Sequence, residues 1–94
     1  MVEYLYDAIR ATAGEEITIS ADITDDNGEV ITEGCAIKLW DDEKLIGSID
    51  GMLIDGLWNF TIPASATIGL KGRYWYSISH NDNSLQFKQP AYLV

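Results

Sequence analysis

Turn-forming residues recur along this chain about every 8 to 12 positions, a spacing that leaves room only for short extended segments between them. Asn27-Gly28, Asp50-Gly51 and Asp55-Gly56 are such signals, because Asn, Asp and Gly tolerate the positive φ that tight reversals require. Between the turns, apolar and polar residues alternate with a period of two, as in a strand that buries one face. The chain is therefore predicted to be an all-β protein.

The clearest alternation runs through residues 17 to 23, where Ile17, Ile19, Ala21 and Ile23 share one face. Residues 1 to 10 alternate weakly and form either a first strand or an extended arm. Other segments with strand-like patterns are 36–40, 45–49, 57–62, 70–78 and 85–94. The stretch after Pro63 is too short for more than one helical turn. The pattern predicts about seven to eight short antiparallel strands.

Short strands joined by tight turns are typical of a β-sandwich with Greek-key connections, and a small closed barrel is the alternative. Residues 1–94 fit one such domain, since a chain of this length buries roughly 60 to 65% of its unfolded surface. Hydrophobic residues make up 47% of the chain and aromatic residues 11%. That content favours a folded domain over a disordered one.

Charge is unevenly distributed along the chain. The net charge is −9, and residues 1–55 carry fourteen acidic against three basic residues, whereas residues 56–94 carry one acidic against three basic residues. Binding to nucleic acid through its phosphates is disfavoured, because that mode needs a basic stripe. The acidity either serves solubility or sets the acidic part of one copy against the basic part of another, or against a basic partner.

The single cysteine and the first residues of the chain indicate in which cellular compartment the protein is made. Cys35 is the only cysteine, so no intrachain disulfide is possible, and we expect it to be a small buried residue at the start of a strand. The first residues lack the basic and apolar regions of a signal peptide, and no apolar run approaches the length of a membrane span. We therefore expect synthesis in the cytoplasm and no membrane partner.

No motif in the sequence indicates catalysis. The only histidine, His80, lies in a turn with no nucleophile placed beside it, so a catalytic triad is not indicated. The acidic turns at 25–29 and 41–43 offer the oxygen ligands that Ca²⁺ takes, but without EF-hand spacing. Asn59-Phe60-Thr61 matches a glycosylation acceptor, with no export signal to reach the modifying compartment. We predict a non-catalytic protein with no metal, no cofactor and no small-molecule substrate.

Residues 70 to 78 are predicted to form a central, half-buried strand. Tyr74 and Tyr76 fall on one parity of this strand, and Arg73 and Trp75 fall on the other, because side chains alternate along a strand. Trp beside Arg on an outward parity is a composition enriched in protein interfaces; the alternative is that another strand or the N-terminal arm covers Trp75. The candidate interface residues, all aromatic or basic, are Arg73, Trp75, Tyr4, Tyr6 and Trp40.

Leu70-Lys71-Gly72-Arg73-Tyr74 resembles the Leu-x-Gly-x-Tyr signature of the tyrosine corner in immunoglobulin-like and fibronectin-like sandwiches. The tyrosine hydroxyl of that corner bonds to nearby backbone, so the resemblance assigns a structural role to Leu70, Gly72 and Tyr74. Residues 14–28, Leu45-Ile46-Gly47 and Asp55-Gly56-Leu57-Trp58 are similar to segments of immunoglobulin-like modules of phages and bacteria. The core disulfide and partner tryptophan of antibody domains are absent from the sequence.

This resemblance implies a structural or interaction protein. Modules of this kind are common in phage tails and capsids, so we expect a head or tail accessory subunit that binds itself or another virion protein and is built into a phage particle. The alternative is one module of a bacterial surface protein or adhesin, whose exposed aromatic residues bind a glycan.

Overall fold

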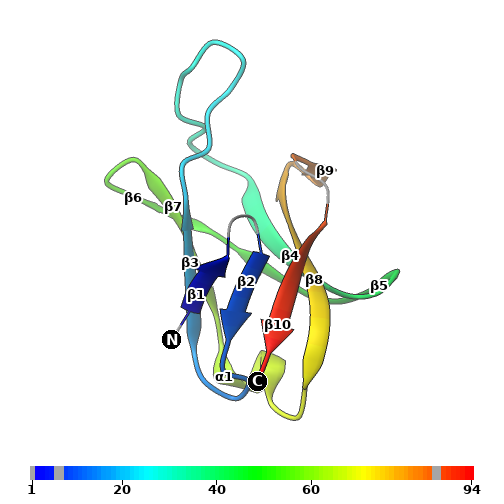
Figure 1. The fold of residues 1–94 in the computed structure, drawn as a ribbon. Coiled ribbons are helices and arrows are strands. Elements are labelled where there is room, and N and C mark those ends of the chain that lie inside the picture. The colour runs from blue at the N-terminus through cyan, green and yellow to red at the C-terminus, as the bar shows by residue number, and fades with distance from the viewer. Residues whose placement is uncertain (1, 6–7, 86–87) are drawn as a thin grey trace.

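The computed structural model describes residues 2–5, 8–85 and 88–94, which form an all-β domain of two sheets (Figure 1). The strands of the larger sheet are β1 (Val2–Leu5), β2 (Ala8–Ala11), β4 (Cys35–Asp41), β5 (Lys44–Asp50), β8 (Gly72–His80), β9 (Asn83–Ser84) and β10 (Gln89–Leu93). The smaller sheet consists of β3 (Ile17–Ala21), β6 (Met52–Ile54) and β7 (Leu57–Ile62). A single helical turn, α1 (Ala64–Thr67), leads from β7 towards β8.

Strand pairing makes β8 the central strand of the larger sheet. That sheet has the order β1-β2-β10-β8-β4-β5, with β9 also paired to β8, and the smaller sheet has the order β3-β7-β6. Trp75 of β8 lies opposite Trp40 of β4 on one side and opposite Pro90 of β10 on the other. The prediction of a central strand at residues 70–78 is confirmed, with bounds two residues later. His80, predicted to lie in a turn, is the last residue of β8 and lies opposite Cys35 of β4.

The core lies between the two sheets and is built mainly from alternate residues of β2, β3, β4, β7, β8 and β10. Phe60 and Ile37, from opposite sheets, have no exposed surface, and the rings of Trp58 and Phe60 stack with centroids 6.4 Å apart. The other buried apolar residues are Ile9, Ala11, Ile17, Ile19, Ile23, Cys35, Leu39, Ile62, Tyr76, Ile78, Ala91 and Leu93. The predicted alternation and the buried position of Cys35 at the start of β4 are both confirmed.

Two details of the predicted sheet were wrong. The described residues form ten short strands rather than seven or eight, and β2 and β10 run parallel rather than antiparallel. The last strand, β10, contains Pro90. This is tolerated because β10 pairs with β2 only from Ala91 onwards, so Pro90 needs no N–H group on that side.

The connection from β3 to β4 forms a long hairpin that extends beyond the two sheets (Figure 1). We call residues 24 to 34 the arm. Thr24 and Val30 form an isolated antiparallel bridge within it, and Gly28 takes the positive φ of +80° expected of the turn. The domain measures 40 × 26 × 23 Å, and the start of β1 and the C-terminus lie at the end away from the arm (Figure 1).

Candidate interaction surface

Two rows of aromatic and basic side chains cross the outward side of the larger sheet. In the first row, Tyr92 of β10 lies between Arg10 of β2 and Arg73 of β8. In the second row, Trp75 of β8 lies beside Trp40 of β4. At least one neighbour of each along its strand lies in the core or packs against it, so these side chains point away from the core. We call this surface, with Lys88 included, the tryptophan face: Arg10, Trp40, Arg73, Trp75, Lys88 and Tyr92.

Cations lie over both tryptophan rings of this face. The Arg73 guanidinium carbon is 5.1 Å from the Trp75 ring centroid, and Lys88 Nζ is 4.0 Å from the Trp40 ring centroid, both within cation–π range. Trp40 Nε1 donates a hydrogen bond to Ser77 Oγ at 3.0 Å, and Lys88 Nζ donates one to the Asp42 carbonyl oxygen at 3.1 Å. The rings and the cations therefore hold one another in a defined arrangement.

A hollow of about 290 Å³ opens beside Trp75 and is lined by Asp42, Glu43, Trp75 and Lys88. Its walls combine an indole ring, an ammonium group and two acidic side chains from the β4–β5 turn. Trp40 and Trp75 are each half-buried, so part of each side chain remains available for contact. The hollow can receive one side chain of a bound partner.

Basic residues gather on this side of the sheet, although the protein is acidic overall. Lys38 of β4 shares the parity of Trp40, and its Nζ lies 3.8 Å from Asp82 Oδ1. Within residues 2–5, 8–85 and 88–94, neither Arg10 nor Arg73 has an ion pair. Among the described side chains, these two arginines therefore have no carboxylate partner.

The other predicted interface residues do not join the tryptophan face. Tyr4 lies opposite Ile9 in the β1–β2 pair, and its hydroxyl accepts a hydrogen bond of 3.4 Å from the backbone N–H of Ser20 in β3. It therefore points towards the smaller sheet, with 54% of its surface exposed. Tyr6 lies outside the described residues. Of the five candidates, the structure brings together Arg73, Trp75 and Trp40.

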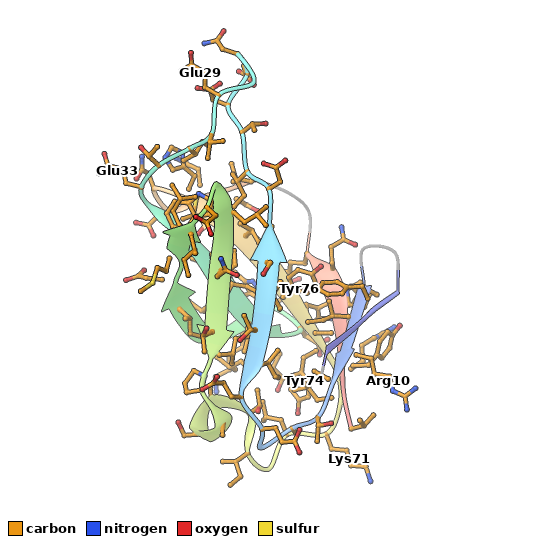
Figure 2. All side chains as sticks on the ribbon, turned by 90° about the vertical axis from the view of Figure 1, so that its left-hand side faces the viewer. Arg10, Glu29, Glu33, Lys71, Tyr74 and Tyr76 are labelled. Atoms are coloured by element: carbon orange, nitrogen blue, oxygen red, sulfur yellow. The ribbon has the colours of Figure 1, made fainter. Side chains whose placement is uncertain are left out.

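The residues of the predicted tyrosine corner lie at the start of β8. Leu70 and Tyr74 are partly buried against the core, and Gly72 has a φ of +108°. Figure 2 shows Tyr74 and Tyr76 on the side of the molecule where β2 and β3 lie. No hydrogen bond of the Tyr74 hydroxyl occurs among the described residues. The tyrosine corner therefore stays a prediction.

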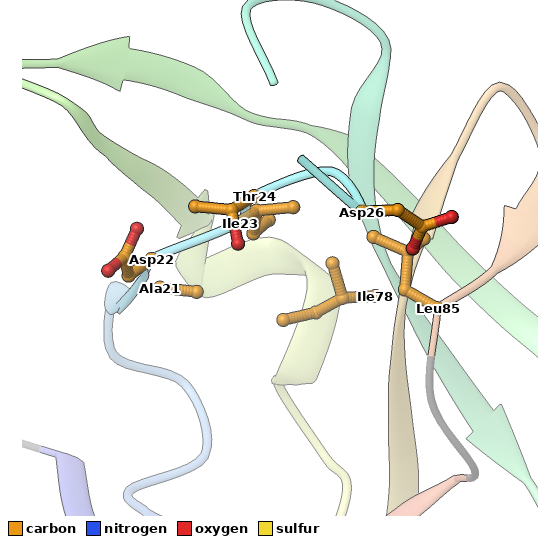
Figure 3. Close-up of a pocket in the computed structure, with 7 residues that line it drawn as sticks. All are labelled: Ala21, Asp22, Ile23, Thr24, Asp26, Ile78 and Leu85. Carbon is orange, nitrogen blue, oxygen red and sulfur yellow. The ribbon is translucent and has the colours of Figure 1, made fainter. Parts of the chain in front are cut away.

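A second hollow, of about 400 Å³, lies at the base of the arm (Figure 3). Its apolar lining includes Ile23, Ile78 and Leu85. The carboxylates of Asp22 and Asp26 stand at opposite sides of it and do not converge on a common point (Figure 3). This arrangement does not form a ligand set for a cation.

Among the described residues, Cys35 is not placed to act as a nucleophile. Cys35 is buried, and burial raises the pKa of its thiol, which opposes formation of the nucleophilic thiolate. Among the described residues, no group of three or more His, Cys, Asp or Glu side chains is placed to hold a metal ion. None of the described helices is both long and apolar enough to cross a membrane.

Sequence reasoning missed three members of the tryptophan face: Arg10, Lys88 and Tyr92. The alternation of Ile9, Arg10 and Ala11 does mark Arg10 as outward. It cannot reveal that β2 lies beside β10, because that parallel pair joins the two ends of the chain.

Comparison of the chain with protein-family models, with curated proteins and with solved structures finds no match.

Proposed function

We propose that this protein is a non-catalytic interaction module that binds another protein through the tryptophan face. The observation that carries this proposal is the pairing of Trp40 with Trp75 on the solvent side of the sheet, with Arg73 and Lys88 stacked on their rings. Trp, Tyr and Arg dominate the binding energy of protein interfaces. Aromatic side chains already held in place lose little conformational freedom on binding.

The proposed fold is an immunoglobulin-like sandwich. If β3 to β8 are taken as strands B, C, C′, D, E and F, and β10 as strand G, the sheets become B-E-D and G-F-C-C′. This is the order of the variable type without its strands A and C″. The first strands, β1 and β2, lie beside β10 instead of beside β3. The strand order and the resemblance of residues 14–80 to immunoglobulin-like modules support the same proposed fold.

For its biological setting, we propose a head or tail accessory subunit of a phage virion that binds itself or another virion protein. The proposal rests on the resemblance of residues 14–80 to modules common in phage tails and capsids, together with the exposed aromatic and basic surface. The genes that flank the coding sequence test it directly. Neighbouring genes for capsid or tail components are expected, and their absence would contradict the virion setting.

A glycan-binding module of a bacterial surface protein is less well supported by the geometry. Sugars bind to tryptophan by stacking on a ring face, and Arg73 and Lys88 occupy one face of each ring here. Those cations suit a partner that carries carboxylates. Binding of neutral oligosaccharides that is lost in Trp75→Ala would favour the glycan reading instead.

Sedimentation velocity over a range of protein concentrations tests the interaction surface. Trp75→Ala should weaken association by about ten-fold or more, because hot-spot truncations cost about 2 kcal/mol or more. Met52→Ala is the matched control, since Met52 is a large apolar residue with 65% exposure on the smaller sheet. If Met52→Ala weakens association and Trp75→Ala does not, the binding surface lies elsewhere. Should the chain be monomeric alone, the same pair of variants is compared for binding to the products of the flanking genes.

A further inference from the structure

The tryptophan face has an acidic counterpart on the same molecule, and the two surfaces suggest what the partner is. Resting on the function proposed above, we propose that the partner is a second copy of this chain, whose arm lies along the row formed by Arg10, Tyr92 and Arg73. Copies would then associate head to tail.

The arm is held in one shape although almost all of it is exposed. The Asp25 carboxylate accepts hydrogen bonds from the backbone N–H groups of Asn27 and Glu29 at 2.9 and 3.0 Å. Asp25 N–H donates to the Glu29 carbonyl at 2.8 Å, and Gly28 N–H donates to the Asp25 carbonyl at 3.0 Å. An ordered arm loses little further entropy on binding.

The base of the arm is fixed to the core. Trp58 Nε1 donates a hydrogen bond of 2.7 Å to the Ile31 carbonyl, and Ile31 N–H donates one of 3.0 Å to the Ile23 carbonyl. Trp58 itself is buried. The direction in which the arm extends is therefore set by the core of the domain, and the arm can act as a rigid ligand.

Charge on the two surfaces is complementary. The arm carries Asp25, Asp26, Glu29 and Glu33 and no basic residue. The opposing row carries Arg10 and Arg73, which have no ion pair within the described part of the chain. Arginine binds carboxylates through two parallel hydrogen bonds. In addition, Val30 of the arm is 39% exposed and Tyr92 of the row is 37% exposed, so each surface offers an apolar contact.

The two surfaces lie at opposite ends of the molecule. Figure 2 shows Glu29 and Glu33 at the end that carries the arm, and Arg10 and Lys71 at the other end. With the longest dimension at 40 Å, an arm directed away from the sheets cannot reach the arginine row of its own chain. The contact must join two molecules, and because different surfaces meet, it closes a ring or extends a filament.

Charge reversal on each surface, followed by mixing, tests this arrangement. The arm variant carries Asp26→Lys and Glu29→Lys, and the row variant carries Arg10→Glu and Arg73→Glu. Each variant alone should be monomeric by sedimentation velocity, because the arm variant loses the net negative charge of its arm and the row variant sets two glutamates against an acidic arm. A one-to-one mixture should associate again, because opposite charges meet at both types of contact. Circular dichroism checks that both variants are folded.

A matched control and the salt dependence complete the experiment. Asp50→Lys with Glu16→Lys makes the same charge change at exposed positions outside both surfaces and should associate like the native chain. Raising the salt from about 0.1 M to about 1 M shortens the screening length from about 10 to 3 Å and should weaken native association by about ten-fold or more.

Three results would overturn the proposal: a native chain that stays monomeric at low salt, reversal variants that associate like the native chain, or a mixture that stays monomeric. If the mixture stays monomeric while Trp75→Ala still weakens binding to a partner relative to Met52→Ala, the tryptophan face keeps its proposed function and the arm is not its ligand. If the mixture associates and Trp75→Ala has no effect, the arm binds the arginine row without the tryptophans.

Discussion

Trp58 connects the core to the base of the arm, so shortening its side chain should affect both. Trp58→Phe removes the Nε1–H group that donates to the Ile31 carbonyl at 2.7 Å, which costs about 1–3 kcal/mol when the acceptor loses its partner. It also leaves a small cavity beside Phe60 at a site only 3% exposed, worth about 1–2 kcal/mol. The two effects together lower the free energy of unfolding by about 3 kcal/mol.

Thermal and urea unfolding followed by far-ultraviolet circular dichroism measure this loss. For a domain of this size, about 3 kcal/mol corresponds to a fall in Tm of about 12 to 24 °C. Hydrogen exchange should also become faster at the Ile31 amide, because its bond to the Ile23 carbonyl lies at the loosened base of the arm.

Trp75→Phe is the matched control, because it makes the same substitution on the outward side of the sheet. No hydrogen bond of Trp75 occurs among the described side chains, and its ring lies outside the core, so a loss below about 1 kcal/mol is expected. A loss below about 1 kcal/mol for Trp58→Phe, or an equal loss for both variants, would refute the role given to Trp58.

Three further variants test the core, the corner and the thiol. A Cβ at Gly51 would stand 2.5 Å from Phe60 and 2.8 Å from Trp58, so Gly51→Ala should lower the free energy of unfolding in urea by about 1–3 kcal/mol. Gly47→Ala is the control and should lower it less, because its Cβ would be 3.9 Å from Leu39. Equal losses for the two variants would contradict crowding at Gly51. Tyr74→Phe should change the free energy of unfolding by less than about 0.5 kcal/mol, whereas a loss of about 1 kcal/mol or more would reveal the predicted corner hydrogen bond. Burial raises the pKa of Cys35 above its ordinary 9.0, so the folded chain keeps this proton longer than the unfolded chain and stability should fall as the pH rises above about 9. Cys35→Ala should fall less steeply over that range, and an unchanged slope would contradict the burial effect.

Local pattern was enough to predict most of the strands. Period-two alternation in Ile17–Ala21 and Leu57–Ile62 placed the correct residues in the core, because each strand buries one face only. Pairing between distant segments could not be predicted from local alternation. Nothing in the alternation of Ala8–Ala11 specifies a parallel partner more than seventy residues later in the chain, since register depends on the whole sheet.

For the tryptophan face too, local alternation predicted some of the residues, whereas contacts between distant segments could not be predicted. The outward parity of Arg73 and Trp75 was readable from one strand, and the structure confirms that they lie outside the core. The contact of Lys88 with Trp40, at 4.0 Å, depends on how the chain returns to β10 after β9, which no local pattern fixes. Tyr4 shows the opposite case: its aromatic character suggested an interface, but its place opposite Ile9 turns it towards β3.

The three tryptophan indoles offer the most direct test of the claim that the tryptophan face binds a partner. Their Nε1–H signals can be followed by ¹H–¹⁵N NMR while the protein is diluted, or while a partner is added. The signals of Trp75 and Trp40 should shift or broaden on binding, and the signal of Trp58, which is 3% exposed and bonded to Ile31, should stay in place. Constant Trp75 and Trp40 signals across a demonstrated association would contradict the claim.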